Sequence, residues 1–190
     1  MAKQMEMRSL EVIPTINDDN EIEGTAVVFN QRSEDLGGFD EIIEPTALNG
    51  VDLSDVALLY NHNGGDVLAR TSAGTLKIDA DEQGVHFRAQ LPKTTLGNDV
   101  RENLLNGNVR GMSFGFKIGK RSWEERGDGN YTQHVQQLDK VFELSLTPFP
   151  AYKETDVQLS ERSLENVKST EKEILLEKEW FAIQKEIGGN

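Results

Sequence analysis

Residues 109–116 read Val109-Arg110-Gly111-Met112-Ser113-Phe114-Gly115-Phe116, a stretch that alternates small and large side chains as a β-strand with two different faces does. Ser113 then shares one face with Gly111 and Gly115, which leaves space for another chain to approach its hydroxyl. The glycine spacing fits the nucleophile elbow of esterases, but no helix is predicted to follow, as that motif requires. Two interpretations remain open: a serine nucleophile, or a barrel strand whose glycines permit curvature.

A candidate general base, His62, follows the continuous apolar run from Val56 to Tyr60. Such a run is typical of a strand buried on both faces, and the residues after it, 61–65, are polar and glycine-rich. A side chain at this point is held at a rim by rigid structure beneath it, which suits proton transfer. The simpler interpretation is a half-buried histidine bonded to a backbone carbonyl.

A candidate orienting acid, Glu143, lies inside the apolar stretch 141–146. A carboxylate there needs a partner, because desolvating an unpaired charge costs roughly several kcal/mol. An imidazole N–H is a good partner that would also fix the histidine tautomer. The competing interpretation is a strand whose Glu143 face meets solvent, with Ser145 beside it. Asp139 and His134 are the substitutes for Glu143.

The chain as a whole predicts a mainly β protein with helices, in the α+β class. Apolar or β-branched segments bounded by turn residues predict strands, and one amphipathic segment predicts a helix. The predicted strands cover residues 5–12, 22–29, 39–44, 56–60, 67–72, 75–79, 85–91, 110–117, 131–138 and 140–146, and the predicted helical segments cover 45–48 and 95–105.

The organisation changes after about residue 160, so we expect a mainly β domain at 1–160 and a helical tail at 161–190. Residues 163–187 contain no Gly or Pro and are rich in Glu, Lys and Leu, which favours helix. This tail either covers the domain or pairs with another copy, and it could also act as a removable targeting segment. We expect the chain to self-associate.

Composition excludes several classes of function. The chain has no cysteine, so thiol nucleophiles, disulfides and thiolate metal sites are absent, and its three histidines are too far apart in sequence for a helical metal pair. We therefore expect no metal and no cofactor. The net charge of −13 argues against a nucleic-acid partner. No membrane segment or signal peptide is predicted, so we expect a soluble cytoplasmic protein.

Six fragments in one order resemble the prohead proteases of tailed phages, over roughly residues 7–160. They are EGTAVVFN (23–30), FDEIIEPTAL (39–48), LLYNHN (58–63), LARTSAGTLKI (68–78), VRGMSFGF (109–116) and FELSLTPFPAY (142–152).

The resemblance implies a herpesvirus-protease-like β-barrel with flanking helices and a serine endopeptidase activity. His62 matches the family's base and Ser113 its nucleophile. Glu143 falls where the third catalytic member is expected, although the herpesvirus enzymes have histidine there and also carry an arginine pair that helps to hold the oxyanion. Arg110 and backbone N–H groups are the candidate oxyanion donors here.

The resemblance also implies a place and a substrate. Prohead proteases act inside the viral procapsid in the host cytoplasm, or as prophage products in a bacterial cytoplasm. They cleave scaffold protein or the scaffolding segment of the major capsid protein, and then themselves. Two alternatives remain: a non-catalytic capsid assembly or scaffolding module, and a serine esterase, which would require a deep apolar pocket.

Overall fold

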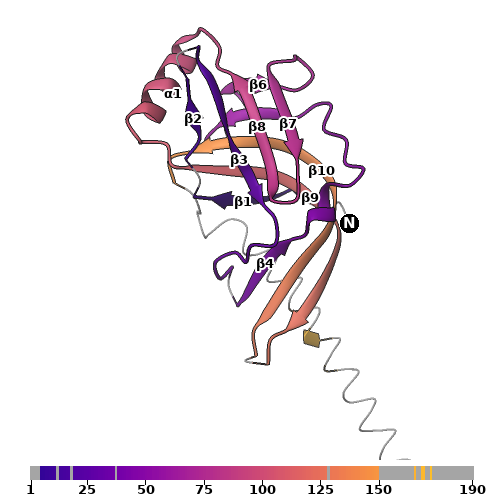
Figure 1. Cartoon of the computed structure of the whole chain (residues 1–190). Helices are drawn as coiled ribbons and strands as arrows, with labels where there is room; N and C mark the ends of the chain where they lie inside the picture. Colours follow the sequence, from indigo (N-terminus) through magenta and orange to yellow (C-terminus); the bar gives the residue numbers. More distant parts are fainter. Residues whose placement is uncertain are drawn as a thin grey trace, which may run out of the picture.

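A computed structural model describes residues 5–149 except positions 12, 18, 37 and 128, together with positions 165, 168, 169 and 172. Within these residues ten β-strands form two sheets, and one α-helix and one 3-10 helix connect strands. Figure 1 shows the two sheets and the long hairpin that extends from one of them. The described part of the chain is therefore mainly β, as the sequence predicted.

The larger sheet is built on the β9–β10 hairpin and has the strand order β1-β9-β10-β5-β6, with β4 paired to β10 beside this row. β1 is antiparallel to β9, and β9 is antiparallel to β10. β4 and β5 both run parallel to β10. Its strands are β1 (Glu6–Leu10), β4 (Phe39–Ile43), β5 (Ala57–Tyr60), β6 (Val67–Arg70), β9 (Gly111–Glu125) and β10 (Tyr131–Thr147).

The smaller sheet has the order β2-β3-β8-β7 and is antiparallel throughout. The helix α1 begins after Thr94, whose side-chain oxygen accepts a hydrogen bond from the Gly97 N–H at 3.2 Å and so caps the helix. The remaining elements are β2 (Thr15–Ile16), β3 (Glu21–Val28), β7 (Leu76–Ala80), β8 (Gly84–Gln90), α1 (Thr95–Leu105) and the 3-10 helix η1 (Pro45–Leu48).

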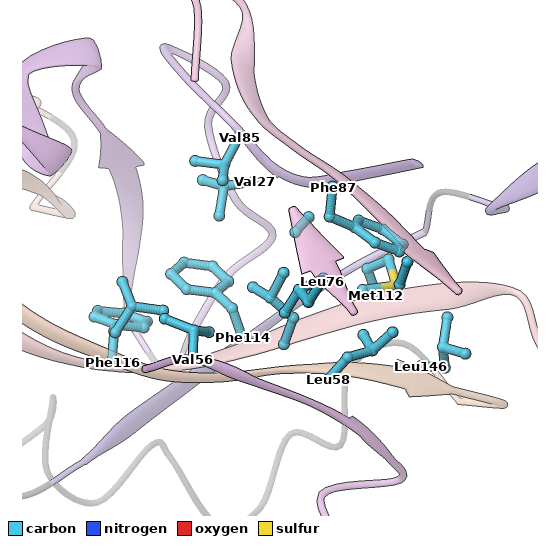
Figure 2. Packing of buried hydrophobic residues seen from close by; sticks show 14 of the residues in the cluster. Val27, Val56, Leu58, Leu76, Val85, Phe87, Met112, Phe114, Phe116 and Leu146 are labelled. Carbon is cyan, nitrogen blue, oxygen red and sulfur yellow. The ribbon is translucent and has the colours of Figure 1, made fainter. Parts of the chain in front are cut away.

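The hydrophobic core lies between the two sheets (Figure 2). Phe114 and Phe116 of β9 are fully or almost fully buried there, and their rings stack at 4.5 Å between centroids. Val27 of β3 and Phe87 of β8 contribute from the smaller sheet. Because alternate residues of a strand point to opposite faces, a core-facing Phe114 directs Ser113 to the other face of the larger sheet.

A β-bulge in β10, between Val141 and Glu143, changes which face of the strand meets the core. Val141 pairs with Phe116, but Glu143 pairs with Gly115, so two steps on β10 match one step on β9. Val141 is in the core, and regular alternation would have placed Glu143 there as well. The extra residue, Phe142, reverses the alternation and moves Glu143 to the face that carries Ser113.

Most predicted elements are confirmed with small shifts of their ends. The strand predicted at 110–117 instead continues to Glu125 as β9, β2 was not predicted, and three further expectations differ. The two strands predicted at 131–138 and 140–146 are one strand, β10, because Asp139 lies in a bulge between Leu138 and Lys140 and does not end the strand. The strand pairing of the described residues forms two open sheets and no closed barrel, so the herpesvirus-protease-like barrel is not confirmed. One α-helix accompanies these sheets at residues 5–149, where flanking helices were expected.

The predicted helical tail at 161–190 lies almost entirely outside the described residues. Its four described positions, 165, 168, 169 and 172, have helical backbone. The division into a domain at 1–160 and a tail stays a prediction. Across the described part of the chain, no helix is both long and apolar enough to span a bilayer.

Candidate active site

His62 lies in a tight turn that follows β5. Asn61 and His62 both have positive φ, 51° and 58°, and the Asn63 N–H donates to the Tyr60 carbonyl oxygen at 3.1 Å. Two consecutive residues with positive φ and this hydrogen bond form a turn of the I′ kind. A left-handed conformation costs about 1–2 kcal/mol for a residue other than glycine, so the turn needs anchoring. The Asn61 N–H supplies one anchor by donating to the Leu146 carbonyl of β10 at 2.8 Å.

The turn directs the imidazole of His62 at Glu143. Nδ1 of His62 lies 2.7 Å from Oε1 of Glu143, and the two side chains are 24% and 7% exposed. A carboxylate can only accept a hydrogen bond, so Nδ1 carries the hydrogen and Nε2 is left as the basic nitrogen. The buried carboxylate that the sequence required to have a partner therefore has an imidazole N–H.

Gly115 makes room for this carboxylate. A Cβ atom at position 115 would lie 2.9 Å from Oε1 and 3.2 Å from Cγ of Glu143, which is closer than side chains normally pack. The space above Gly115, which the sequence suggested was open to another chain, is thus occupied by the Glu143 side chain. The glycine leaves room for the Glu143 carboxylate over β9, and the His62 ring from the turn after β5 meets it there.

Ser113 lies on the same face of the sheet, one strand away. It pairs with Ser145 of β10, so the Cβ atoms of the two serines are about 4.5–5.5 Å apart. Ser113 is fully buried, and its hydroxyl donates to the carbonyl oxygen of Arg8 in β1 at 2.9 Å. Among the described residues, no hydrogen bond joins His62 to Ser113.

Arg8 is fixed by a buried ionic network. Its Nε and NH2 groups donate to the two carboxylate oxygens of Glu41, both at 2.8 Å, and NH2 also contacts Glu6 at 2.9 Å. Such bidentate pairs are geometrically specific. The network therefore anchors the side chain of Arg8, while the pairing of β1 with β9 places its carbonyl beside the Ser113 hydroxyl.

The residues considered as substitutes for Glu143 have other partners. Asp139 forms an ion pair with Lys117 at 3.3 Å, and His134 lies 3.1 Å from Glu124 and 3.5 Å from Glu44. Of the three acids and histidines considered for the third position, Glu143 is the one that the structure brings to His62.

The remaining expectations for the site concern the oxyanion and metals. Arg110 is exposed and its Nε donates to the Gly107 carbonyl at 3.1 Å, so the structure does not direct that nitrogen at Ser113. Within the described ranges, no group of three or more histidine, aspartate or glutamate residues is arranged to hold a metal ion.

The sequence of this chain is similar to those of known proteins. Residues 3–170 match the family described as caudovirus prohead serine protease. The chain belongs to that family. A curated relative is the prohead protease of Enterobacteria phage HK97, which is 28% identical over 139 residues, covering 71% of this chain and 57% of that protease. The chain thus spans a little over half the length of this relative.

A similar solved structure is that of the bacteriophage T4 capsid assembly protease. It shares 11% sequence identity with this prohead protease family member, with a TM-score of 0.47, over 76% of this chain and 97% of the T4 chain.

Two residues of this site were not found from the sequence. From the sequence Ser145 is only a polar neighbour of Glu143, but in the structure it is fully buried and bonded to both Glu143 and the His62 backbone. The available signal was its position two residues after Glu143, on the same face of a strand. Arg8 had no such signal, because its role depends on pairing between segments more than a hundred residues apart.

Proposed function

We propose that this chain is a serine endopeptidase of phage head maturation, in which Ser113 is the nucleophile, His62 the general base and Glu143 the orienting acid. It would cleave scaffold protein or the scaffolding segment of the major capsid protein inside the procapsid, and also itself. The observation that carries the proposal is the 2.7 Å contact between His62 Nδ1 and Glu143 Oε1, on the sheet face that bears Ser113. Membership of the prohead serine protease family supports the class of reaction.

The mechanism begins with a turn of the Ser113 side chain. Its hydroxyl now donates to the Arg8 carbonyl, and rotation about χ1 would redirect it toward Nε2 of His62. Catalytic hydrogen bonds are often long or misaligned before a substrate binds, and they tighten in the complex. A peptide backbone entering this face would displace the contact with Arg8 and favour the rotated hydroxyl.

The chemical steps are those of acyl transfer. Ser113 Oγ attacks the scissile carbonyl carbon while His62 Nε2 takes the hydroxyl proton, and the C–N bond then breaks as Nε2 gives that proton to the leaving amine. Water reverses the sequence and releases the acyl group. The negative charge of Glu143 stabilises the imidazolium that forms in each step. Each well-placed oxyanion donor would contribute about 3 kcal/mol.

A second candidate function, a non-catalytic capsid assembly module, is favoured by the state of Ser113. The serine is fully buried and its hydroxyl is bonded to a backbone carbonyl, as a purely structural serine would be. The esterase alternative is less well supported, because an esterase would need an apolar pocket at its serine. The apolar pocket lined by Phe114 and Leu144 lies on the core side of the hairpin, on the face opposite Ser113.

The decisive experiment incubates the purified chain with the capsid and scaffold proteins of the same phage and identifies fragments by mass spectrometry. Ser113→Ala should stop cleavage without affecting folding, and Ser122→Ala, on an exposed position of the same strand, should not change it. Cleavage at the normal rate by Ser113→Ala would remove the nucleophile assignment. If the unaltered chain forms assemblies with the shell proteins but cleaves neither of them, the assembly module becomes the better answer.

A further inference from the structure

We propose that Ser145 is a positioning residue that holds both the backbone and the catalytic ring of His62. The proposal rests on the function proposed above, in which His62 is the base. It adds a residue that touches neither substrate nor the reacting atoms and acts through His62 and Glu143.

The contacts form a closed loop. The His62 N–H donates to Oγ of Ser145 at 3.1 Å, and the Ser145 hydroxyl donates to Oε2 of Glu143 at 2.6 Å. The other carboxylate oxygen, Oε1, accepts from Nδ1 of His62 at 2.7 Å. Main chain and ring of the histidine are therefore joined through one hydroxyl and one carboxylate.

This loop fixes the plane of the carboxylate. A carboxylate bonded at one oxygen can rotate about its last torsion, whereas one bonded at both oxygens is held in a single orientation. Ser145 is fully buried, so bulk water does not compete for Oε2 of Glu143. The orientation of Oε1, and with it the direction of the His62 ring, follows from the Ser145 hydroxyl.

The same serine also connects the backbone of the base to the strand that faces the nucleophile. Ser145 pairs directly with Ser113 across the β9–β10 hairpin. It also accepts from the N–H of His62, which has a φ of 58° and belongs to the turn after β5. One residue thus ties the turn carrying the base to the strand position opposite the nucleophile.

Ser145 is not itself placed to be the nucleophile. A nucleophilic hydroxyl gives its proton to the basic ring nitrogen, and the Ser145 proton points to Glu143 instead. Its oxygen also accepts the His62 backbone N–H, which lowers its electron density.

The test compares three changes at position 145 with a matched control on the same strand. Ser145→Ala removes the hydroxyl, Ser145→Cys replaces it with a weak donor of similar shape, and Ser145→Thr keeps it. The control, Thr147→Val, removes a buried hydroxyl two residues along the same face that contacts Phe149 and neither His62 nor Glu143.

The first readout is the downfield proton NMR signal of the His62 Nδ1–H group, which requires no activity. We expect it in the unaltered chain, in Ser145→Thr and in Thr147→Val, and we expect its loss or broadening in Ser145→Ala and Ser145→Cys. An unchanged signal in the alanine and cysteine variants would overturn the proposal, whether or not the chain proves to be a protease.

The second readout is kinetic. We expect kcat to fall about 10- to 100-fold in Ser145→Ala with KM unchanged, as when an outer hydrogen-bond partner of a functional histidine is lost. An unchanged kcat, or a fall in Thr147→Val of the same size, would contradict the positioning role. Full activity of Ser113→Ala would instead refute the proposed function and leave the NMR result to decide the role of Ser145.

Discussion

Replacing Glu143 by glutamine is a sharp test of the proposed triad, because it keeps the size of the side chain and removes its charge. Both carboxylate oxygens accept hydrogen bonds in the structure, Oε1 from His62 Nδ1 at 2.7 Å and Oε2 from Ser145 Oγ at 2.6 Å. An amide has one oxygen that accepts and one nitrogen that only donates. Glutamine therefore cannot replace both contacts at once.

The Ser145 hydroxyl decides which contact survives. If the amide oxygen faced His62, the buried Ser145 donor would lose its acceptor, at a cost of about 1–3 kcal/mol. We therefore expect the amide oxygen to face Ser145 and the NH2 group to face Nδ1 of His62. The ring hydrogen then moves to Nε2, which can no longer accept the Ser113 proton. Such a tautomer reversal lowers kcat on the order of 10⁴-fold, or about 5.4 kcal/mol of transition-state stabilisation.

The assay is the second-order rate at which a fluorophosphonate phosphonylates Ser113, with loss of fluoride, and the adduct is located by mass spectrometry. Nitrogen NMR shifts of His62 report in parallel which ring nitrogen carries the hydrogen. Glu124→Gln is the matched control, because this exposed carboxylate lies 3.1 Å from Nε2 of another histidine, His134. Phosphonylation of Ser113 in Glu143→Gln at the normal rate would refute the reasoning, and an adduct on Ser145 would show that the wrong serine was assigned.

Two further changes test the surroundings of the site. Gly115→Ala would place a Cβ atom 2.9 Å from Oε1 of Glu143, so the carboxylate must move. We expect phosphonylation of Ser113 to slow by up to about 10²-fold while the melting temperature changes little. Unimpaired phosphonylation would contradict the role of this glycine. Arg8→Met would leave the buried carboxylate of Glu41 without its bidentate partner. We therefore expect denaturant titration to show a loss of about 3–5 kcal/mol in the free energy of unfolding. The control Arg88→Met, on an exposed site, should match the unaltered chain. Equal stability of the two arginine variants would show that the network does not stabilise β1.

Local patterns predicted most of the elements because the chemistry that forms them is local. The apolar run before His62 and the polar turn after it gave β5 and its rim position from adjacent residues. The helix at 95–105 was predicted with the ends that the structure has, because its apolar spacing and the terminal Gly107 are both sequence signals. Glu143 could be proposed because a buried charge needs a partner, a requirement that does not depend on the fold.

The contacts between distant segments could not be predicted in the same way. The hydrogen bond from Ser113 to the Arg8 carbonyl joins residues 105 positions apart and depends on the pairing of β1 with β9. Sheet closure is a similar case, because it depends on which end strands pair. Strand propensity is the same in an open sheet and a closed barrel, so the sequence predicted the strands and left the barrel to the resemblance.

The site depends on a bulge that a period-two pattern conceals. Val141, Glu143 and Ser145 are spaced for one face of a regular strand, and that face would be the hydrophobic core, since Val141 lies there. The bulge between Val141 and Glu143 reverses the alternation, so Leu144 enters the core while the acid and the serine turn to the face of Ser113. The sequence does contain the signal, as a spacing of three between the core residues Val141 and Leu144 where a regular strand would have two or four. A pair of polar residues can therefore lie within an apolar strand without an unpaired charge in the core, because one additional residue moves it to the opposite face.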